Sequence, residues 1–163
     1  MKSKWLWVLL VVLAAVGVYA GTVLATPPSG QSTTTVARAS FDPLDLRGSV
    51  PHVWKAKIKT RGTSDLYVID NTFAANGGTS GWHSHPGPSL VFVVSGTVTN
   101  YMTHGHHCMQ NDYTAGQGFV DEGGDSAHML KNNGAVAART IAVQFLPLGA
   151  TRRIDEDDPG NCN

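Results

Sequence analysis

The sequence predicts an all-β protein whose short antiparallel strands form a sandwich or barrel, preceded by one apolar N-terminal segment. Eleven of the 18 glycines lie between Gly77 and Gly134, which indicates a chain that turns often. After the N-terminal segment no apolar period of 3.6 residues occurs, and without helices to connect parallel strands the strands are expected to pair antiparallel. The 163 residues, 42% of them hydrophobic and 15% charged, suffice for one folded domain.

Residues 1–25 have the pattern of a signal peptide or of a signal-anchor helix. Lys2 and Lys4 precede an uncharged, mostly apolar run over residues 5–25. Small residues would permit cleavage after Ala20 or Ala25, whereas the uncut run is just long enough to span the roughly 30 Å hydrocarbon core of a membrane. In both alternatives the positive-inside rule places the rest of the chain outside the cytoplasm, either released or anchored to the membrane.

The remaining chain is expected to consist of a flexible tether at 26–40, a barrel domain at 41–147 and a C-terminal tail at 148–163. The tether prediction rests on the many Thr, Ser and Pro residues and on the lack of any apolar period. Gly- and Asn-rich turn sequences divide the domain into short segments of strand character. We expect strands at 52–59, 65–73, 79–85, 89–94, 97–103, 108–114, 118–121, 127–131 and 136–146.

The two cysteines, Cys108 and Cys162, predict a disulfide, because exported chains with an even cysteine count are usually cross-linked. This bond would close a loop of about 54 residues and pin the tail, which is too polar to be held by burial. The alternative is a Cys108 thiolate that binds a metal beside the neighbouring histidines.

Charge and motifs exclude several function classes. Residues 26–163 carry 10 basic and 12 acidic side chains, so no basic field is present to bind nucleic acid, and we expect no nucleic-acid partner. The sequence also lacks a G-x-S-x-G elbow, a phosphate-binding glycine loop, a C-x-x-C pair and an H-E-x-x-H motif.

Histidine spacing points to a metal site. His83 and His85 are two residues apart in a segment of strand character, so their side chains face the same side about 6.6 Å apart. His128 lies in a second predicted strand and would supply a third imidazole. The alternative is that the three histidines are only packed polar groups.

The segment 81–96, with Gly81, His83, His85 and Gly96, resembles the first motif of the cupin superfamily, in which a glycine leads to H-x-H, a glutamate and a second glycine. Residues 116–132, with His128, resemble the second motif. The resemblance covers roughly residues 50–147. It implies a small single-domain cupin, an antiparallel double-stranded β-helix or jelly-roll barrel, with three histidines as metal ligands.

Two features depart from the cupin pattern. Ser89 stands where cupins place a ligand glutamate, and its hydroxyl is a poor ligand, while the second motif lacks its usual proline before His128. Water, an anion or a substrate would then complete a three-imidazole site. Imidazole ligands favour one divalent transition metal, either Zn, Fe or Cu.

Two acidic residues precede His128 and are candidate catalytic groups. One of Asp121 and Glu122 is expected to face the pocket as a hydrogen-bond acceptor for a ligand or as a general base. The alternative is that both are solvated turn carboxylates.

The sequence therefore predicts an exported mononuclear metal-binding cupin that binds, and in one version transforms, a small molecule at the three-histidine site. As an enzyme it would be a metal-dependent oxidoreductase similar to cupin dioxygenases, or an isomerase. The alternative is a non-enzymatic cupin that binds a small ligand or a metal outside the membrane. A homodimer is compatible with the resemblance, because paired barrels are common in the family.

Overall fold

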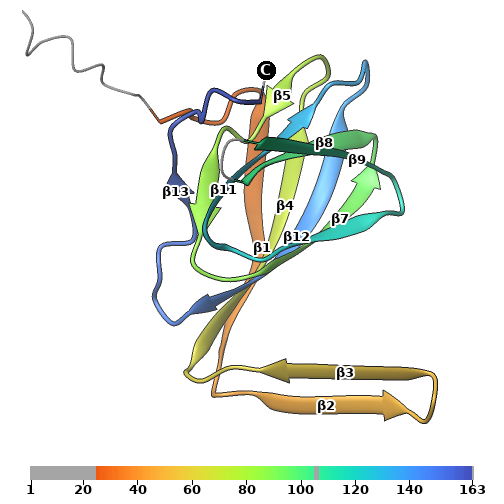
Figure 1. Cartoon of the computed structure of the whole chain (residues 1–163), viewed down its shortest axis with the longest axis vertical. Helices are drawn as coiled ribbons and strands as arrows, with labels where there is room; N and C mark the ends of the chain where they lie inside the picture. Colours follow the sequence, from red (N-terminus) through yellow and green to blue (C-terminus); the bar gives the residue numbers. More distant parts are fainter. Residues whose placement is uncertain (1–24, 105–106, 163) are drawn as a thin grey trace, which may run out of the picture.

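Two antiparallel sheets face each other and enclose the core, and a two-stranded hairpin projects from them (Figure 1). The computed structural model describes residues 25–104 and 107–162. The expected signal peptide or anchor at 1–25 lies outside the described residues except for Ala25. Within the described ranges, no helix is long and apolar enough to cross a membrane.

Each sheet is built from strands that are distant in the sequence. The first sheet has the order β1 (Gln31–Phe41), β4 (Ser64–Phe73), β12 (Ala138–Pro147), β7 (Ser89–Ser95) and β10 (Gly118–Asp121). The second has the order β13 (Ile154–Asp155), β6 (His83–His85), β11 (Gly124–Asn132), β8 (Thr97–His104) and β9 (His107–Thr114), with β5 (Gly78–Thr79) beside β11. The pairings are antiparallel, which confirms the predicted all-β antiparallel fold.

The core lies between the two sheets because successive side chains along a strand point alternately inward and outward. In β7, Val91 and Val93 are buried, whereas Leu90 and Phe92 between them are exposed. The largest cluster of buried apolar side chains consists of Ile69, Phe73, Val91, Val93, Val98, Leu130, Ala138 and Ala142.

The prediction of a flexible tether at 26–40 is wrong for most of its length. Residues 31–41 form β1, which pairs with β4 along its whole length, with a bulge between Thr35 and Ala37. The strand lacks an apolar alternation because it lies at the sheet edge with nearly all of its side chains exposed, and its residues Gln31 and Thr33 line the cavity between the sheets. Its many threonines are β-branched and suit an extended strand.

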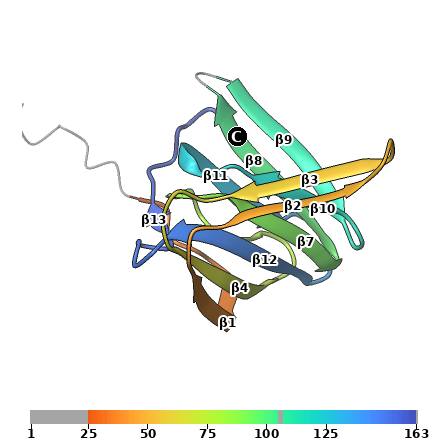
Figure 2. The ribbon, with the colours of Figure 1, turned by 90° about the horizontal axis from the view of Figure 1, so that it is seen from below.

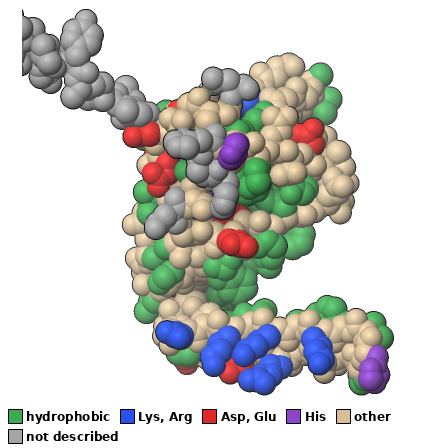
Figure 3. Space-filling view, in the orientation of Figure 1, with side chains coloured by type: hydrophobic (Ala, Val, Ile, Leu, Met, Phe, Trp, Pro, Cys, Tyr) green, Lys and Arg blue, Asp and Glu red, His purple; other side chains and the backbone are tan. Residues whose placement is uncertain are grey.

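The hairpin of β2 (Asp45–Val50) and β3 (Trp54–Lys59) extends away from the body (Figures 1 and 2). The predicted strand at 52–59 corresponds to β3 and part of the turn, and β2 was not predicted. Nearly all side chains of the hairpin are exposed, and lysine and arginine side chains are spread along its length (Figure 3). The hairpin therefore contributes no side chain to the core.

The predicted disulfide between Cys108 and Cys162 is confirmed. The bond links β9 to the end of the C-terminal tail, with a Cα–Cα distance of 5.2 Å. The alternative of a metal-binding Cys108 thiolate is wrong, because the sulfur is already bonded to Cys162.

A buried carboxylate, Asp65 of β4, joins this strand to β1 and to the turn that follows β12. It accepts hydrogen bonds from Arg38 at 2.7 Å, from Ser40 at 2.6 Å and from the backbone N–H of Gly149 at 2.9 Å. The bonds from Ser40, Gly149 and Arg38 lower the pKa of Asp65 from 3.8 to about 2.

Asp65→Asn is expected to lower the melting temperature by several degrees at neutral pH. The side-chain NH₂ of asparagine would face one of the hydrogen-bond donors, such as Arg38 or Ser40, that the carboxylate now accepts from. The native pKa lies below the unfolded value, so this carboxylate stabilises the fold above about pH 4 and ceases to do so as the pH falls towards 2. Thermal unfolding of both proteins at pH 7 and pH 3 measures the effect. Asp42→Asn, which alters an exposed carboxylate, is the control. An equal difference in melting temperature at both pH values would contradict the prediction.

Candidate metal centre

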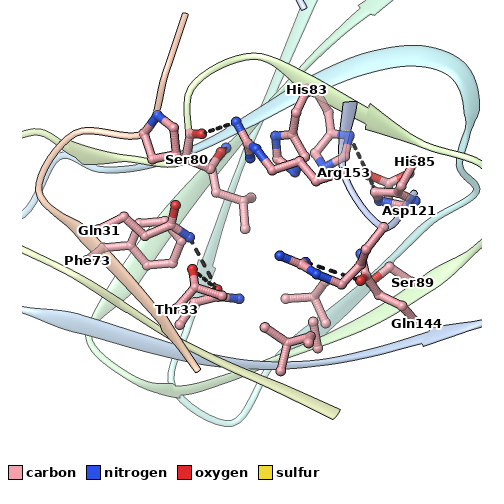
Figure 4. Close-up of a pocket in the computed structure, with 18 of the residues that line it drawn as sticks. Gln31, Thr33, Phe73, Ser80, His83, His85, Ser89, Asp121, Gln144 and Arg153 are labelled. Atoms are coloured by element: carbon pink, nitrogen blue, oxygen red, sulfur yellow. Dashed lines mark hydrogen bonds and ion pairs between the residues drawn. The ribbon is translucent and has the colours of Figure 1, made fainter. Parts of the chain in front are cut away.

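Three histidines from two neighbouring strands of the second sheet meet at one end of a cavity between the sheets (Figure 4). His83 and His85 lie on β6, and His128 of β11 is the direct register partner of His83. The ring centroids are 4.2 Å apart for His83 and His128 and 5.1 Å apart for His85 and His128. The structure thus places all three predicted histidines at the cavity, but the cluster of converging ligand atoms consists of His85, His128 and Asp121 and does not include His83.

The glycine that begins the first motif allows a close backbone approach. Gly81 has φ of 66°, and a Cβ at this position would collide with the carbonyl oxygen of Thr26. The backbone N–H of Trp82 also donates to the Thr26 hydroxyl at 2.8 Å. These contacts hold the start of β6 against the segment before β1.

Backbone carbonyls set the tautomers of His83 and His85. Nδ1 of His85 lies 2.6 Å from the carbonyl oxygen of Gly87, and Nδ1 of His83 lies 3.0 Å from that of Gly81. A carbonyl oxygen only accepts, so each Nδ1 carries a proton, which leaves Nε2 as the ring nitrogen that a metal could bind. A histidine whose outer nitrogen is fixed by a carbonyl is typical of a metal ligand.

A carboxylate, Asp121 at the end of β10, joins the histidines. Its Oδ2 lies 2.7 Å from Nδ1 of His128 and 3.4 Å from Nε2 of His85. Its Oδ1 accepts the backbone N–H of Gly123 at 2.8 Å, which orients the side chain. Asp121 is the register partner of Ser89, so a carboxylate stands directly across the ladder from the serine that replaces the cupin glutamate.

The surroundings of His83 and Asp121 fix the protonation states of these two side chains. Burial, the neighbouring His128 and Arg153 lower the pKa of His83 to about 2, so this imidazole is neutral at physiological pH. Burial raises the pKa of Asp121, but the contacts with His128 and His85 outweigh it and hold that pKa well below its usual range. The centre therefore offers a neutral imidazole at His83 and an ionised carboxylate at Asp121.

The residues fit a metal ion by their convergence and by their lack of other partners. One ligand atom each from His85, Asp121 and His128 lies within 4.8 Å of the others, and all three side chains are buried. Nδ1 of His128 and Oδ2 of Asp121 are 2.7 Å apart, yet within the described part of the chain neither has a well-oriented hydrogen bond. Buried polar atoms without partners are costly, and a cation between them would remove that cost.

The structure separates the two predicted acidic candidates. Asp121 is buried at the centre, whereas Glu122 is exposed and does not line the cavity, so its candidacy as a pocket group is wrong. The side chains alternate along the chain at this point, which turns neighbouring residues in opposite directions.

Sequence reasoning missed Arg152 and Arg153, which line the cavity from the C-terminal tail. The tail was judged only by its polarity, and no local pattern indicates where it folds back. The cavity has a volume of about 250 Å³, and its other walls combine apolar and neutral polar side chains. These include Thr33, Ile69, Asn71, Phe73, Leu130 and Gln144.

No protein-family model matches this sequence, and no curated protein matches it. Solved structures do match. A recombinant oxalate oxidase in complex with glycolate has a TM-score of 0.52 and 22% identity, covering 85% of this chain and 60% of that chain. An oxalate oxidase in complex with the substrate analogue glycolate has the same TM-score and coverage, with 21% identity. A cupin domain from Bordetella pertussis Tohama I has a TM-score of 0.46 and 16% identity, covering 73% of this chain and 95% of that chain.

This chain has the cupin fold. The finding confirms the resemblance noted in the two histidine motifs, and at these identities it establishes the fold alone. The chain spans about 60% of the length of the oxalate oxidases that it matches. Its candidate metal centre occupies the end of the barrel at which β6, β10 and β11 meet.

Proposed function

We propose that this cupin binds one divalent transition metal through His83, His85, His128 and Asp121, and that it takes a small molecule into the adjoining cavity. The observation that carries the proposal is the convergence of His85, His128 and Asp121, whose ligand atoms lie within 4.8 Å of one another, with the ring of His83 beside that of His128 in the same cavity. Two histidines and one carboxylate with a further imidazole suit Zn, Fe or Cu. When bound, such a metal supplies Lewis acidity, and iron or copper adds electron transfer.

The chain's own side chains would position the small molecule. Gln144 and Ser89 are buried on the first sheet and line the cavity, and Thr33 adds a hydroxyl from β1. Apolar walls such as Phe73 exclude water around the bound molecule. The proposal covers the predicted oxidoreductase or isomerase as well as the non-enzymatic binder, because both need the same metal and cavity.

We also propose that the protein works outside the cytoplasm. The Cys108–Cys162 disulfide is consistent with an oxidising, extracytoplasmic location. The apolar run at 5–25 supports export, with retention at the membrane when it is not cleaved.

Elemental analysis of the untagged full chain, purified from an oxidising compartment, tests the metal proposal. About one equivalent of zinc, iron or copper per chain is expected. The full chain is used because a fragment that begins at Phe41 would lack nearly all of β1.

His128→Ala should remove most of this metal, because His128 is the ligand that lies beside both His83 and Asp121. His52→Asn is the matched control: it removes an exposed imidazole from the hairpin turn, and asparagine tolerates the φ of 61° at that position. A protein without metal after reconstitution, or equal loss in both variants, would contradict the proposal.

A further inference from the structure

The tail returns to the candidate metal centre after β12. Ile154 and Asp155 form β13, which pairs with Ser84 and His83 of β6, so the tail lies along the strand that carries two of the histidines. Glu156 adds a hydrogen bond from the Ser84 hydroxyl at 2.6 Å. Through these contacts and the disulfide, the tail places two arginines at the cavity.

The two arginines have different partners. Arg153 donates to the carbonyl oxygen of Ser80 at 2.7 Å (Figure 4) and to Asp155 at 2.6 Å. Its charge is therefore paired and its side chain is fixed. Arg152 donates only a long hydrogen bond, 3.4 Å, to the amide oxygen of Gln144. Among the described residues no acidic side chain pairs with Arg152. Arg152 is therefore a half-buried guanidinium with most of its donors unused.

The charges at the cavity are not balanced. Of the two cationic residues that line it, Arg153 is paired with Asp155, so Arg152 remains as the unpaired charge, and a divalent metal would exceed the single negative charge of Asp121. Burial and then the charge of Arg153 lower the pKa of Arg152, which reflects the cost of holding this guanidinium partly out of water. An anion in the cavity would remove that cost.

We propose that Arg152 binds the carboxylate of a small organic acid in this cavity. The inference rests on the proposed function, since it names the class of molecule that the same cavity takes. One unpaired guanidinium matches one carboxylate in a bidentate pair, whereas a phosphate carries more charge and usually meets several cations. The cavity of about 250 Å³ and its apolar walls at Ile69, Phe73 and Leu130 suit a small organic body.

Calorimetric titration of the zinc-loaded full chain with malonate tests the inference, with malonamide as the uncharged counterpart and inorganic phosphate as the competing anion. Malonate is expected to bind at least about tenfold more tightly than malonamide, and Arg152→Gln should weaken malonate binding by about tenfold or more without changing zinc content. Arg152→Lys keeps the charge but not the planar fork, so it should recover only part of the affinity.

The matched control is Arg47→Gln, which removes an exposed arginine of the hairpin and should leave malonate binding unchanged. Equal malonate affinity in the wild type and in a folded Arg152→Gln variant would overturn the inference, as would tighter binding of phosphate than of malonate. Absence of bound zinc would instead overturn the proposed metal function. Titration of the metal-free protein then decides the role of Arg152 separately, because its pairing with a carboxylate needs no metal.

Discussion

Asp121→Ser is expected to weaken zinc binding by about a hundredfold, because among the described residues it removes the only carboxylate at the candidate centre. The variant leaves three imidazoles, which carry no negative charge to offset that of the ion. Competition between the protein and a chelating dye of known zinc affinity measures the change. Asp42→Ser, which removes an exposed carboxylate outside the cavity, is the control.

A second variant tests whether this carboxylate replaces the glutamate of the cupin motif. Ser89 is the register partner of Asp121 and is buried at the same cavity. Ser89→Glu combined with Asp121→Ser moves the carboxylate across the ladder and should recover at least about tenfold of the lost zinc affinity. Zinc affinity in Asp121→Ser equal to that of the wild type would contradict the assignment of Asp121 as a ligand.

Loss of the disulfide is expected to destabilise the protein by about 4 kcal/mol in the chain-entropy model, because Cys108 and Cys162 are 54 residues apart. The bond restricts the unfolded chain and holds a tail that buries little apolar surface. Urea unfolding of the wild type and of the double variant Cys108→Ser/Cys162→Ser measures the difference in free energy of unfolding.

Reductant provides the matched control for this experiment. It should shift the unfolding midpoint of the wild type to that of the double variant, and it should leave the double variant unchanged. The freed tail should also become a site of proteolysis at 148–160, because β13 is only two residues long. Equal midpoints for the oxidised wild type and the double variant would rule out a stabilising role for the bond.

The fold class was predictable because it depends on local patterns. Glycine- and asparagine-rich turns separate the strands and no helical period interrupts them, so most strands of the body were predicted close to their observed bounds. β1 escaped prediction because it is an edge strand with nearly all of its side chains exposed, and its cavity-lining residues Gln31 and Thr33 are polar, so its polarity does not alternate.

The amino-acid sequence by itself determined the all-β class, the H-x-H pair and the disulfide. Turn residues and the H-x-H spacing are local features of the sequence, and the cysteine count is a property of its composition. Only the tertiary structure decided the rest of the centre. The pairing of β10 with β7 sets Asp121 opposite Ser89, and the return of the tail along β6 brings Arg152 to the cavity. In these placements the register partners, such as Ser89 and Asp121, are 32 residues or more apart in the sequence. No local period encodes a register over that distance.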